Sequence, residues 1–595
     1  MLDQILAQQT IAAVKEIFDT DIGQELNLIQ KTRKEFDGDL TIVVFPLTKI
    51  LRKSPQLIGE ELGKYLQTHS GMVQAYRVVS GYVNITIKPS FWKDVFIRNY
   101  GDPSFGILKP AAEDPVVIEY SSPNTNKPLH LGHIRNNLIG YSLARILGAC
   151  GENVVKVNLV NDRGIHICKS MLAWQRWSRG ETPESAGMKG DHLIGKYYVL
   201  FENAYREQVK ELVGAGMTEE EALRQAPLMG DAQRMLKKWE ERDKETLALW
   251  HRMNQWAYNG FDETYRQMGV DFDRIYYESD TYLLGKELVE EGLRQGLLQR
   301  KEDGSVWADL TAEGLDWKLL IRSDGTSVYM TQDLGTAQMR YDEFHPKKLI
   351  YVVGNEQIYH FDVLKLILKK LGKRWSDSIY HLSYGMVELP EGKMKSREGK
   401  VVDADDLMQE MFVTAGKMTR ELGKLEDFSD EEASGLFRQV GLAALKYFIL
   451  KVDPMKTMVF NPEESIDFNG NTGPFIQYTY ARIQSVLRKA AVPEMSGNDF
   501  FSIDYQPIPK EISLIKILAV FPSTVREAGE MYSPAVIAAY VYDLAREYNQ
   551  FYHDHSILKA TEPAQVHFRI ELSRFVGNVI KTAMGLLGIE VPEKM

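Results

Sequence analysis

Cysteine is scarce in this sequence, because only Cys150 and Cys168 occur among its 595 residues. Two cysteines cannot form the disulfide framework on which small secreted domains depend. A structural zinc site would have to take most of its ligands from the 12 histidines, unlike the cysteine-rich sites that usually hold zinc. We therefore expect neither a disulfide framework nor a protein-bound metal.

Long hydrophobic runs are also missing from the chain. A membrane-spanning helix needs about 18 or more consecutive apolar residues, and no run approaches that length. The N-terminus has Asp3 where a secretory signal would carry basic charge. The sequence therefore predicts a cytoplasmic protein without a membrane partner.

Positive charge is in deficit, since 71 Lys and Arg stand against 82 Asp and Glu and give a net charge of −11. This argues against broad, non-specific nucleic-acid binding but leaves room for a local basic face. With 44% hydrophobic and 26% charged residues, the composition is that of a folded globular protein. The length corresponds to about four domains.

The first 108 residues mix helical and strand patterns. Apolar residues from Leu57 to Leu66 have helical spacing, whereas residues 82–87 alternate as a half-buried strand does. Turn-forming residues follow at 101–106. We predict a small α+β domain over residues 1–108.

Residues 109–390 contain two strand–helix–strand units, the pattern of a parallel sheet. The predicted strands are 116–120, 154–160, 349–353 and 379–384, and the predicted helices are 134–147 and 361–371. The class is therefore α/β, with a Rossmann-like doubly wound parallel sheet. The charged stretch at about 171–257 is predicted to be a helical insertion, and residues 323–326 a hairpin turn between two strands.

After about residue 405, helical spacing replaces strand patterns, as at Leu442, Leu445 and Ile449. We predict a loop and helical junction over residues 391–460. An all-α bundle is predicted over residues 461–595.

The loop after the first predicted strand contains the pattern His130-Leu131-Gly132-His133 and opens directly into a helix. Free N–H groups at a helix start attract phosphate, and ligands of open parallel sheets bind beyond the carboxyl ends of the strands. Two imidazoles there can donate hydrogen bonds to phosphate oxygens as charge builds during attack. In isolation, such a short motif is better interpreted as helix capping or metal binding. Its place between a strand and a helix favours the phosphate role.

A second loop, residues 391–400, follows the last predicted strand and contains Lys393, Lys395 and Arg397. By itself it would be interpreted as an ordinary solvated loop. Because the histidine motif lies on the other half of the sheet, we expect these cations to hold a triphosphate from the opposite side.

Together the two loops resemble the signature motifs of class I aminoacyl-tRNA synthetases. Residues 122–133 read Ser-Pro-Asn-x-x-Lys-Pro-Leu-His-Leu-Gly-His, which is similar to arginyl-tRNA synthetases in particular. Supporting stretches lie at 160–164, 327–335 and 586–592, so the resemblance covers nearly the whole chain. The second loop departs from the family pattern, because Lys395 stands at its third position, where the family has serine, and Ser396 at its fourth.

The resemblance implies a ligase that uses ATP with Mg²⁺ to join arginine to tRNA(Arg), and we expect a monomer. It assigns catalysis to Lys127, His130, His133 and Lys393, with Lys127 substituting for a loop lysine. It assigns ATP binding to Gly132, Gly354, Met386, Val387, Lys393, Lys395 and Ser396. It assigns arginine binding to Asn124, Glu278, Tyr329, Asp333 and Gln357, and tRNA binding to Tyr82 and Asn84.

The chemistry of the ligands agrees with these assignments. A guanidinium has five donors and no acceptor, so its pocket must supply carboxylates, and the α-amino group needs a further acceptor. Tyr82 and Asn84 lie two residues apart on a predicted strand and share one side, which suits stacking and edge reading of an unstacked base.

Two other functions fit the histidine motif. The first is a nucleotidyltransferase that acts on a small acceptor, but such proteins are short, and the N-terminal domain and long helical end count against it. The second is a synthetase-like protein that binds RNA or arginine without catalysis. The presence of His130, His133 and Lys393 counts against this second alternative.

Overall fold

The structure is a computed structural model that describes residues 2–23, 26, 28–33, 35–110, 114–388, 402–421, 428–490, 505–560 and 562–595. The chain forms two compact units. The first contains residues 1–106, 482–524 and 543–580, and the second contains residues 107–481, 525–542 and 581–595. Among the described residues, no helix combines the length and apolar character that crossing a membrane requires.

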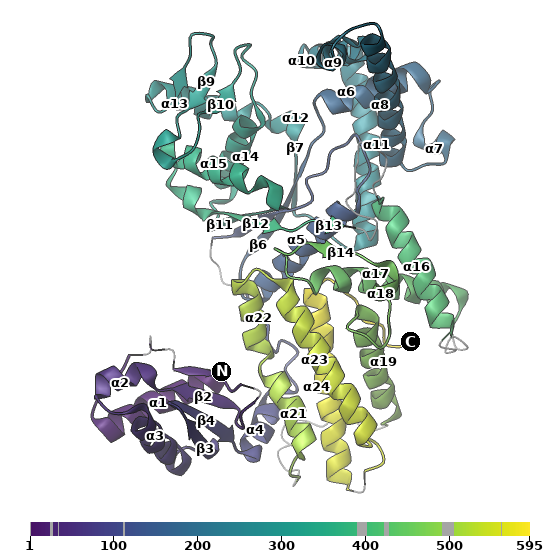
Figure 1. Cartoon of the computed structure of the whole chain (residues 1–595). Coiled ribbons are helices and arrows are strands. Elements are labelled where there is room, and N and C mark those ends of the chain that lie inside the picture. The colour runs from purple at the N-terminus through teal and green to yellow at the C-terminus, as the bar shows by residue number, and fades with distance from the viewer. Residues whose placement is uncertain are drawn as a thin grey trace. The chain divides into compact units, whose positions relative to one another are not determined.

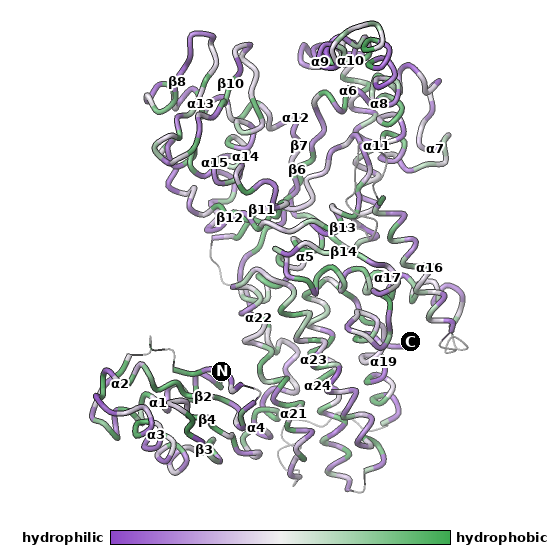
Figure 2. Tube along the Cα trace, viewed as in Figure 1, coloured by the Kyte–Doolittle hydropathy of each residue, from purple (hydrophilic) through white to green (hydrophobic). Residues whose placement is uncertain are grey.

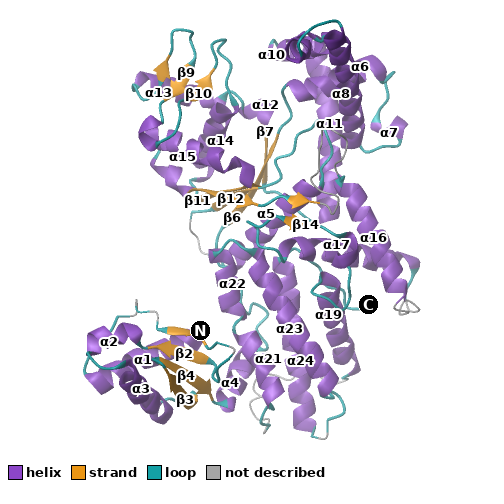
Figure 3. Ribbon diagram, viewed as in Figure 1, coloured by secondary structure: helices purple, strands orange, loops and turns teal. Residues whose placement is uncertain are grey.

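The N-terminal part of the first unit is the predicted small α+β fold. Its antiparallel sheet has the order β1-β2-β4-β3, and α1 and α3 pack against it (Figure 3). The strands are β1 (Ile29–Lys31), β2 (Leu40–Val43), β3 (Val73–Val79) and β4 (Tyr82–Ile87), and the helices are α1 (Leu2–Phe18), α2 (Phe45–Leu51), α3 (Pro55–His69) and α4 (Pro89–Asn99). The predicted strand 82–87 is confirmed, and the predicted helix 57–66 lies inside α3, which starts earlier because Ser54 caps it through the N–H of Leu57.

The C-terminal third is helical, as predicted, but its helices are divided between the two units. These helices are α19 (Gly473–Lys489), α21 (Pro509–Ala519), α22 (Phe521–Glu530), α23 (Pro534–Asp554) and α24 (Pro563–Leu586). Hydrophobic and hydrophilic residues alternate along α23 and α24, as in amphipathic helices (Figure 2). Within the first unit, Phe96 of α4 packs on Phe568 and Phe575 of α24, with ring centroids 5.1 and 6.0 Å apart.

The second unit is built on a five-stranded parallel sheet with the order β12-β11-β5-β6-β7 (Figure 1). The strands are β5 (Val116–Glu119), β6 (Val154–Val160), β7 (Arg274–Tyr277), β11 (Lys348–Gly354) and β12 (Ile379–Tyr384). Helices α5 (Leu131–Ala149) and α15 (Ile358–Lys370) connect β5 to β6 and β11 to β12. The predicted doubly wound sheet is confirmed. The chain runs from β5 to β6 on one side and reaches β11 on the other, so the strand order reverses between β5 and β11, where such sheets bind ligands.

The predicted helical insertion follows β6 but is longer than expected. It comprises α6 (Ile165–Trp177), α7 (Pro183–Ala186), α8 (Gly190–Gly214), α9 (Glu219–Gln225), α10 (Pro227–Glu240) and α11 (Lys244–Met268). The last helix continues past residue 257 because Phe261, Tyr265 and Met268 keep the helical spacing and are buried. It ends at Gly269, whose φ of 66° places it in the left-handed conformation that favours glycine.

A second projection lies between β7 and β11. It contains α12 (Glu278–Thr281), α13 (Leu284–Arg294), an antiparallel sheet of β8 (Gln299–Arg300), β9 (Val306–Ala308) and β10 (Lys318–Ile321), and α14 (Tyr329–Phe344). The prediction of a hairpin at 323–326 is only partly right. The turn is closed by the Arg322 N–H bonding to the Thr326 carbonyl at 2.9 Å, but a single bridged pair, Ile321 with Ser327, follows before α14 begins.

Beyond residue 401 the unit continues with α16 (Ala404–Glu421), α17 (Asp430–Leu450) and α18 (Pro462–Ser465). The helical prediction for this part holds with one exception. The two-residue strand β14 (Met458–Val459) pairs in parallel with β13 (Val387–Glu388).

Candidate active site at the carboxyl ends of the parallel strands

The two histidines of the first motif cap helix α5. His130 is the N-cap residue, and its Nδ1 accepts a hydrogen bond from the Gly132 N–H at 3.1 Å. The Nδ1 of His133 accepts the N–H of His130 at 3.2 Å, which closes a capping box. The two ring centroids lie 4.0 Å apart. The motif is therefore both a cap and a pair of imidazoles at the positive end of a 19-residue helix.

Both imidazoles are neutral at physiological pH. Burial lowers the pKa of His130 to about 3, with a further contribution from nearby Lys127, and burial likewise holds the pKa of His133 well below its usual range. Because each Nδ1 accepts a backbone N–H, the proton of each ring is on Nε2. Each Nε2–H is thus a fixed neutral donor.

The loop between β5 and α5 is strained where it turns into the site. Ser121 and Ser122 have φ values of 78° and 48°, which side-chain-bearing residues rarely adopt. Side-chain amides hold both turns, because Asn136 of α5 accepts the Ser121 N–H at 2.5 Å and Asn158 of β6 accepts the Ser122 N–H at 3.0 Å. The turn leaves Asn124 exposed beside the end of β6, where it bridges Asn161.

Lys127, Asn124 and His130 all line one cavity of about 710 Å³. Burial lowers the pKa of the Lys127 ammonium, and among the described residues no carboxylate pairs with it. A phosphate in this cavity would supply the missing negative charge.

Glu278 begins α12 at the carboxyl end of β7 and is only 9% exposed. Burial raises its pKa to about 7; Arg163 opposes this rise, while the carboxylates of Asp162 and Asp333 add to it. Arg163 is itself paired with Glu240 at 3.1 Å, and among the described residues no ion pair joins Glu278 to a lysine or arginine. A ligand cation that approached it would relieve the repulsion between the three acids.

Asp162 holds the turn that carries Glu278, and the sequence analysis gave it no role. It is fully buried at the end of β6. Its carboxylate accepts the N–H and hydroxyl of Ser279 at 2.8 and 2.7 Å, and the hydroxyl of Tyr258 at 2.8 Å. The only local sign of this role was its position directly after a buried strand.

Asp333 and Tyr329 lie one turn apart on α14, as expected from the sequence. Oδ2 of Asp333 lies 2.6 Å from Nε2 of His360 on α15, a hydrogen-bond partner that the sequence did not predict. Tyr329 is 72% exposed at the start of α14. Gln357 is exposed in the short 3₁₀ turn η2 (Asn355–Gln357) that follows β11.

The five residues predicted to bind arginine thus follow β5, β7, β10 and β11. Four of these positions, those of Asn124, Glu278, Asp333 and Gln357, offer the carboxylate and amide acceptors that a guanidinium and an α-amino group need. Of the predicted ATP-binding residues, Gly132 lies in the first turn of α5, Gly354 ends β11, Met386 is 39% exposed and Val387 is buried in β13. Lys393, Lys395 and Ser396 lie outside the described residues.

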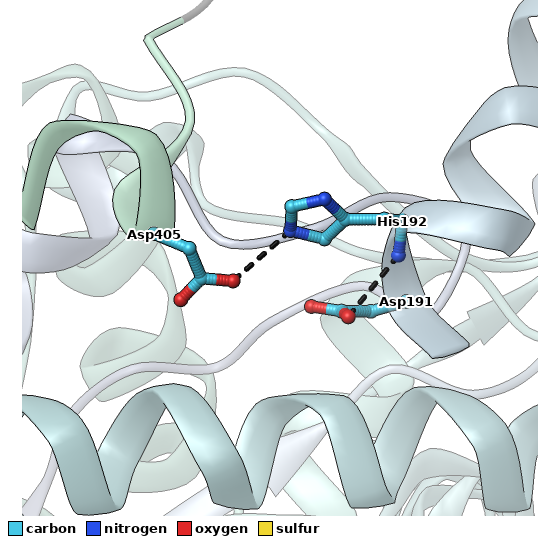
Figure 4. A group of neighbouring side chains, drawn as sticks. All are labelled: Asp191, His192 and Asp405. Carbon is cyan, nitrogen blue, oxygen red and sulfur yellow. Dashed lines mark hydrogen bonds and ion pairs between the residues drawn. The ribbon is translucent and has the colours of Figure 1, made fainter. Parts of the chain in front are cut away.

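A charged cluster joins the insertion to the residues after the second loop (Figure 4). Asp191 and His192 of α8 and Asp405 of α16 place their ligand atoms within 4.8 Å of one another, a spacing at which a metal could bind. However, the Lys189 ammonium contacts Asp405 and lies 3.4 Å from Asp191. The cluster supplies its own positive charge, so we assign no metal to it.

The same cluster lies next to an isolated antiparallel β-bridge between His130 and Asp403. The Leu131 N–H bonds to the Val402 carbonyl at 3.0 Å and the Ala404 N–H to the Leu129 carbonyl at 3.0 Å. Asp405 follows directly. Burial raises its pKa, but hydrogen bonds from His192 and Lys189 outweigh burial and hold the pKa at about 2.

The two residues predicted to bind tRNA lie on β4 in the first unit. Tyr82 is half-buried and packs edge-on against Phe45, with ring centroids 5.3 Å apart. Asn84 is 4% exposed, and its Oδ1 accepts the Thr41 hydroxyl at 2.7 Å. Tyr82 is thus the more accessible of the pair in this conformation.

Known families match this chain over nearly its whole length. Residues 106–461 match the catalytic domain of class I tRNA synthetases (R), residues 4–87 the arginyl tRNA synthetase N terminal domain, and residues 476–595 the DALR anticodon binding domain. The chain belongs to the arginyl-tRNA synthetase family. It is therefore a class I aminoacyl-tRNA synthetase, as the sequence motifs indicated.

Relatives of this family are similar from end to end. The arginine–tRNA ligases of Parabacteroides distasonis and Phocaeicola vulgatus are 56% and 58% identical, and each alignment covers 100% of both chains. The arginyl-tRNA synthetase of Thermus thermophilus has the same fold, with a TM-score of 0.80 at 24% identity and 100% coverage of both chains.

Proposed function

We propose that this synthetase activates arginine with ATP and transfers it to the 3′ end of tRNA(Arg). One observation carries the proposal: the carboxylate of Glu278, whose pKa burial raises to about 7, belongs to the same sheet edge as the neutral His130 and His133 pair. The first group suits a guanidinium, and the second suits a phosphate undergoing attack.

Arginine recognition would combine charge and shape. We assign the guanidinium to Glu278 and Asp333, because two carboxylates can receive its planar donors. Asn124 and Gln357 would receive the α-amino and carboxylate groups. Tyr329, one turn before Asp333, would cover the side chain of the substrate.

In the activation step, a carboxylate oxygen of arginine attacks the α-phosphorus of ATP, and the bond to the β-phosphate oxygen breaks. The products are arginyl-adenylate and pyrophosphate. The Nε2–H groups of His130 and His133 would donate to the α-phosphate oxygens, whose charge grows in the transition state. Lys127 and Lys393 would balance the charge of the departing pyrophosphate. No side chain forms a covalent intermediate.

Mg²⁺ would arrive with ATP. Phosphate oxygens and water normally supply most of its ligands when it accompanies a nucleotide. We therefore assign no set of protein ligands to it.

In the transfer step, a ribose hydroxyl at the 3′ end of the tRNA attacks the carbonyl carbon of the adenylate, and AMP leaves. We assign Tyr82 to stacking on an unpaired tRNA base, because it is the accessible aromatic of β4. Asn84 would read the base edge only if it exchanged its contact with Thr41.

Arginine-dependent exchange of pyrophosphate into ATP, measured with and without tRNA, tests the proposal. We expect exchange with arginine and none with lysine, since lysine lacks the planar donors. A wild-type protein that exchanges with neither, yet binds arginine in calorimetry, would support a non-catalytic binding protein instead.

A further inference from the structure

A separate cavity of the second unit lies far from the histidine motif. It has a volume of about 300 Å³ and is lined by residues of α5, the end of α11, α17 and the last turn of α24 with the residues that follow it. Arg145 of α5 lines this cavity, and it lies about 22 Å along the helix from His130 at 1.5 Å per residue. We call it the Lys446 cavity. It is distinct from the candidate active site.

Positive charge is in excess in the Lys446 cavity. Arg145, Arg266 and Lys446 line it, and the carboxylate in its lining is that of Glu590, which Gln439 holds at 2.9 Å. Among the described residues, none of the three cations is in an ion pair, and each bonds to a backbone carbonyl. In a chain with a net charge of −11, such a local surplus of positive charge favours an anion.

Lys446 is the buried member of this group, with only 4% of its surface exposed. Its ammonium donates to the Gly588 carbonyl at 2.6 Å, and its other N–H groups have no acceptor among the described residues. Burial lowers the pKa of Lys446 to about 8; Glu590 opposes this fall, and Arg145 adds to it. A bound anion would therefore supply the charge and the acceptors that this ammonium lacks.

Helix capping accounts for only part of this arrangement. Arg145 and Lys446 both bond to carbonyls at the C-terminal end of α24, where cations stabilise a helix. Arg266 differs from them, because its Nε donates at 3.2 Å to the Asp262 carbonyl of its own helix. Capping of α24 gives no reason for a third cation in the same cavity.

The size of the Lys446 cavity suits a small ligand. A volume of about 300 Å³ is at the lower end for small-molecule sites. A phosphate in the backbone of a nucleic-acid duplex could not reach an ammonium as buried as that of Lys446. A neighbouring cavity of about 710 Å³ shares Arg145 and Ile589 with it, and Leu108 and Ala149 belong to its apolar lining. The second cavity has room for the rest of a phosphorylated small molecule.

We propose that the Lys446 cavity binds the phosphate group of a small ligand. Two guanidinium groups and one ammonium are the donors that phosphate oxygens accept from best. The source of the phosphate would be either the inorganic ion or a small phosphomonoester whose body extends into the neighbouring cavity. The inference does not depend on the proposed function, since it uses none of the residues assigned to arginine, ATP or tRNA.

The first test measures phosphate affinity by calorimetry in two matched variants of α11. Arg266→Gln removes a charge from the cavity, and Arg252→Gln removes one from an exposed arginine of the same helix that lines neither cavity. Both are made in a Lys127→Ala background, which weakens phosphate binding at the candidate active site. We expect Arg266→Gln to weaken binding roughly tenfold or more and Arg252→Gln to have no effect.

The second test follows a proton. Lys446 is mostly neutral at about pH 8.5, and a bound anion favours its charged form, so binding should take up a proton. Sulfate is the probe because it does not titrate there, and calorimetry in buffers of different ionisation enthalpy measures the uptake. Lys446→Met in the same Lys127→Ala background should remove the uptake and weaken binding, and thermal melting checks that it folds.

The source of the phosphate is identified by comparing inorganic phosphate with phenyl phosphate. Tighter binding of phenyl phosphate, lost in Arg266→Gln, would identify a phosphomonoester. Equal or weaker binding of phenyl phosphate, with the same loss of inorganic phosphate in Arg266→Gln, would identify the inorganic ion. Either result supports the proposal.

Two results would overturn it. The first is equal phosphate affinity in Arg266→Gln, Arg252→Gln and their common background. The second is a folded Lys446→Met variant that keeps both the affinity and the proton uptake. If Lys446→Met lowers the melting temperature and Arg266→Gln leaves phosphate affinity unchanged, the cations serve only to cap α24. Pyrophosphate exchange by Arg266→Gln should stay near wild type, so these outcomes are independent of the proposed function.

Discussion

Ser279 gives two hydrogen bonds to the carboxylate of Asp162, one from its N–H at 2.8 Å and one from its hydroxyl at 2.7 Å. These contacts tie the first turn of α12 to the end of β6. Glu278, the residue before Ser279, therefore depends on Asp162 for its position.

Asp162→Asn should weaken arginine binding through Glu278. The amide cannot accept at both oxygen positions, and a hydrogen bond to a charged group contributes about 1.5 to 3 kcal/mol, or roughly ten- to a hundredfold in affinity. Calorimetry with arginine and with ATP should show loss for arginine only. In a double-mutant cycle with Glu278→Gln, the two losses should not add, because both act on one group. Additive losses would make Asp162 a general structural residue.

Arginine binding should become tighter as pH rises through 7. The carboxyl of Glu278 has a pKa of about 7, and the guanidinium that we propose as its partner would bind the ionised form. Below pH 7 the affinity should fall by roughly tenfold per pH unit, and binding near pH 7 should release a proton. Calorimetry in buffers of different ionisation enthalpy measures that proton. Glu278→Gln should remove the pH dependence.

The carboxyl of Glu278 should lower the free energy of unfolding at neutral and higher pH. The folded-state pKa lies above the ordinary value of 4.5, so the protein without arginine loses stability as pH rises from 4.5 through 7. The full difference is about 3 kcal/mol. Glu278→Gln should therefore melt at a higher temperature than wild type at pH 8. A lower melting temperature at pH 8 would contradict the buried, unpaired carboxylate described here.

His130→Ala and His133→Ala should each reduce adenylate formation about a hundred- to a thousandfold, because one preorganised donor to a growing oxyanion contributes about 2.7 to 4 kcal/mol. Each variant also removes a cap of α5, at a cost of about 1 kcal/mol in stability. His→Gln at either position retains a donor and is the matched control. If an alanine variant has a native circular dichroism spectrum and exchanges pyrophosphate near the wild-type rate, the histidine it replaces does not act on the phosphate.

Lys127→Ala should be severe, and Lys395→Ser nearly silent. Lys127 lines the cavity of His130 and has no carboxylate partner among the described residues, so its charge is available to a phosphate. Lys395 replaces the serine of the family motif, so we expect it to be solvated, and Lys393→Ala to be severe. Pyrophosphate exchange measures all three. A large loss in Lys395→Ser with little in Lys127→Ala would assign the charge to the second loop.

Local patterns in the sequence were enough to predict several strands and the place of the histidine motif at a helix start. The strands 82–87, 154–160 and 379–384 were predicted with the bounds that the structure shows, because alternation and buried runs depend only on neighbouring residues. His130 and His133 were placed at a helix start for the same reason, since capping acts within one turn. The residues of the proposed arginine pocket were predicted from the family resemblance and not from local patterns.

The partners of those residues depended on tertiary structure. Asp333 with His360 and Asp405 with His192 are contacts between residues 27 and 213 positions apart, and no periodicity connects such pairs. The family resemblance assigned Asn84 to a tRNA base and strand alternation agreed with it, but neither can show that Thr41 of the neighbouring strand occupies its oxygen. The sequence predicted which groups would bind arginine and phosphate. The pairing of the strands, which brings distant residues to one edge of a sheet, decided which of them meet.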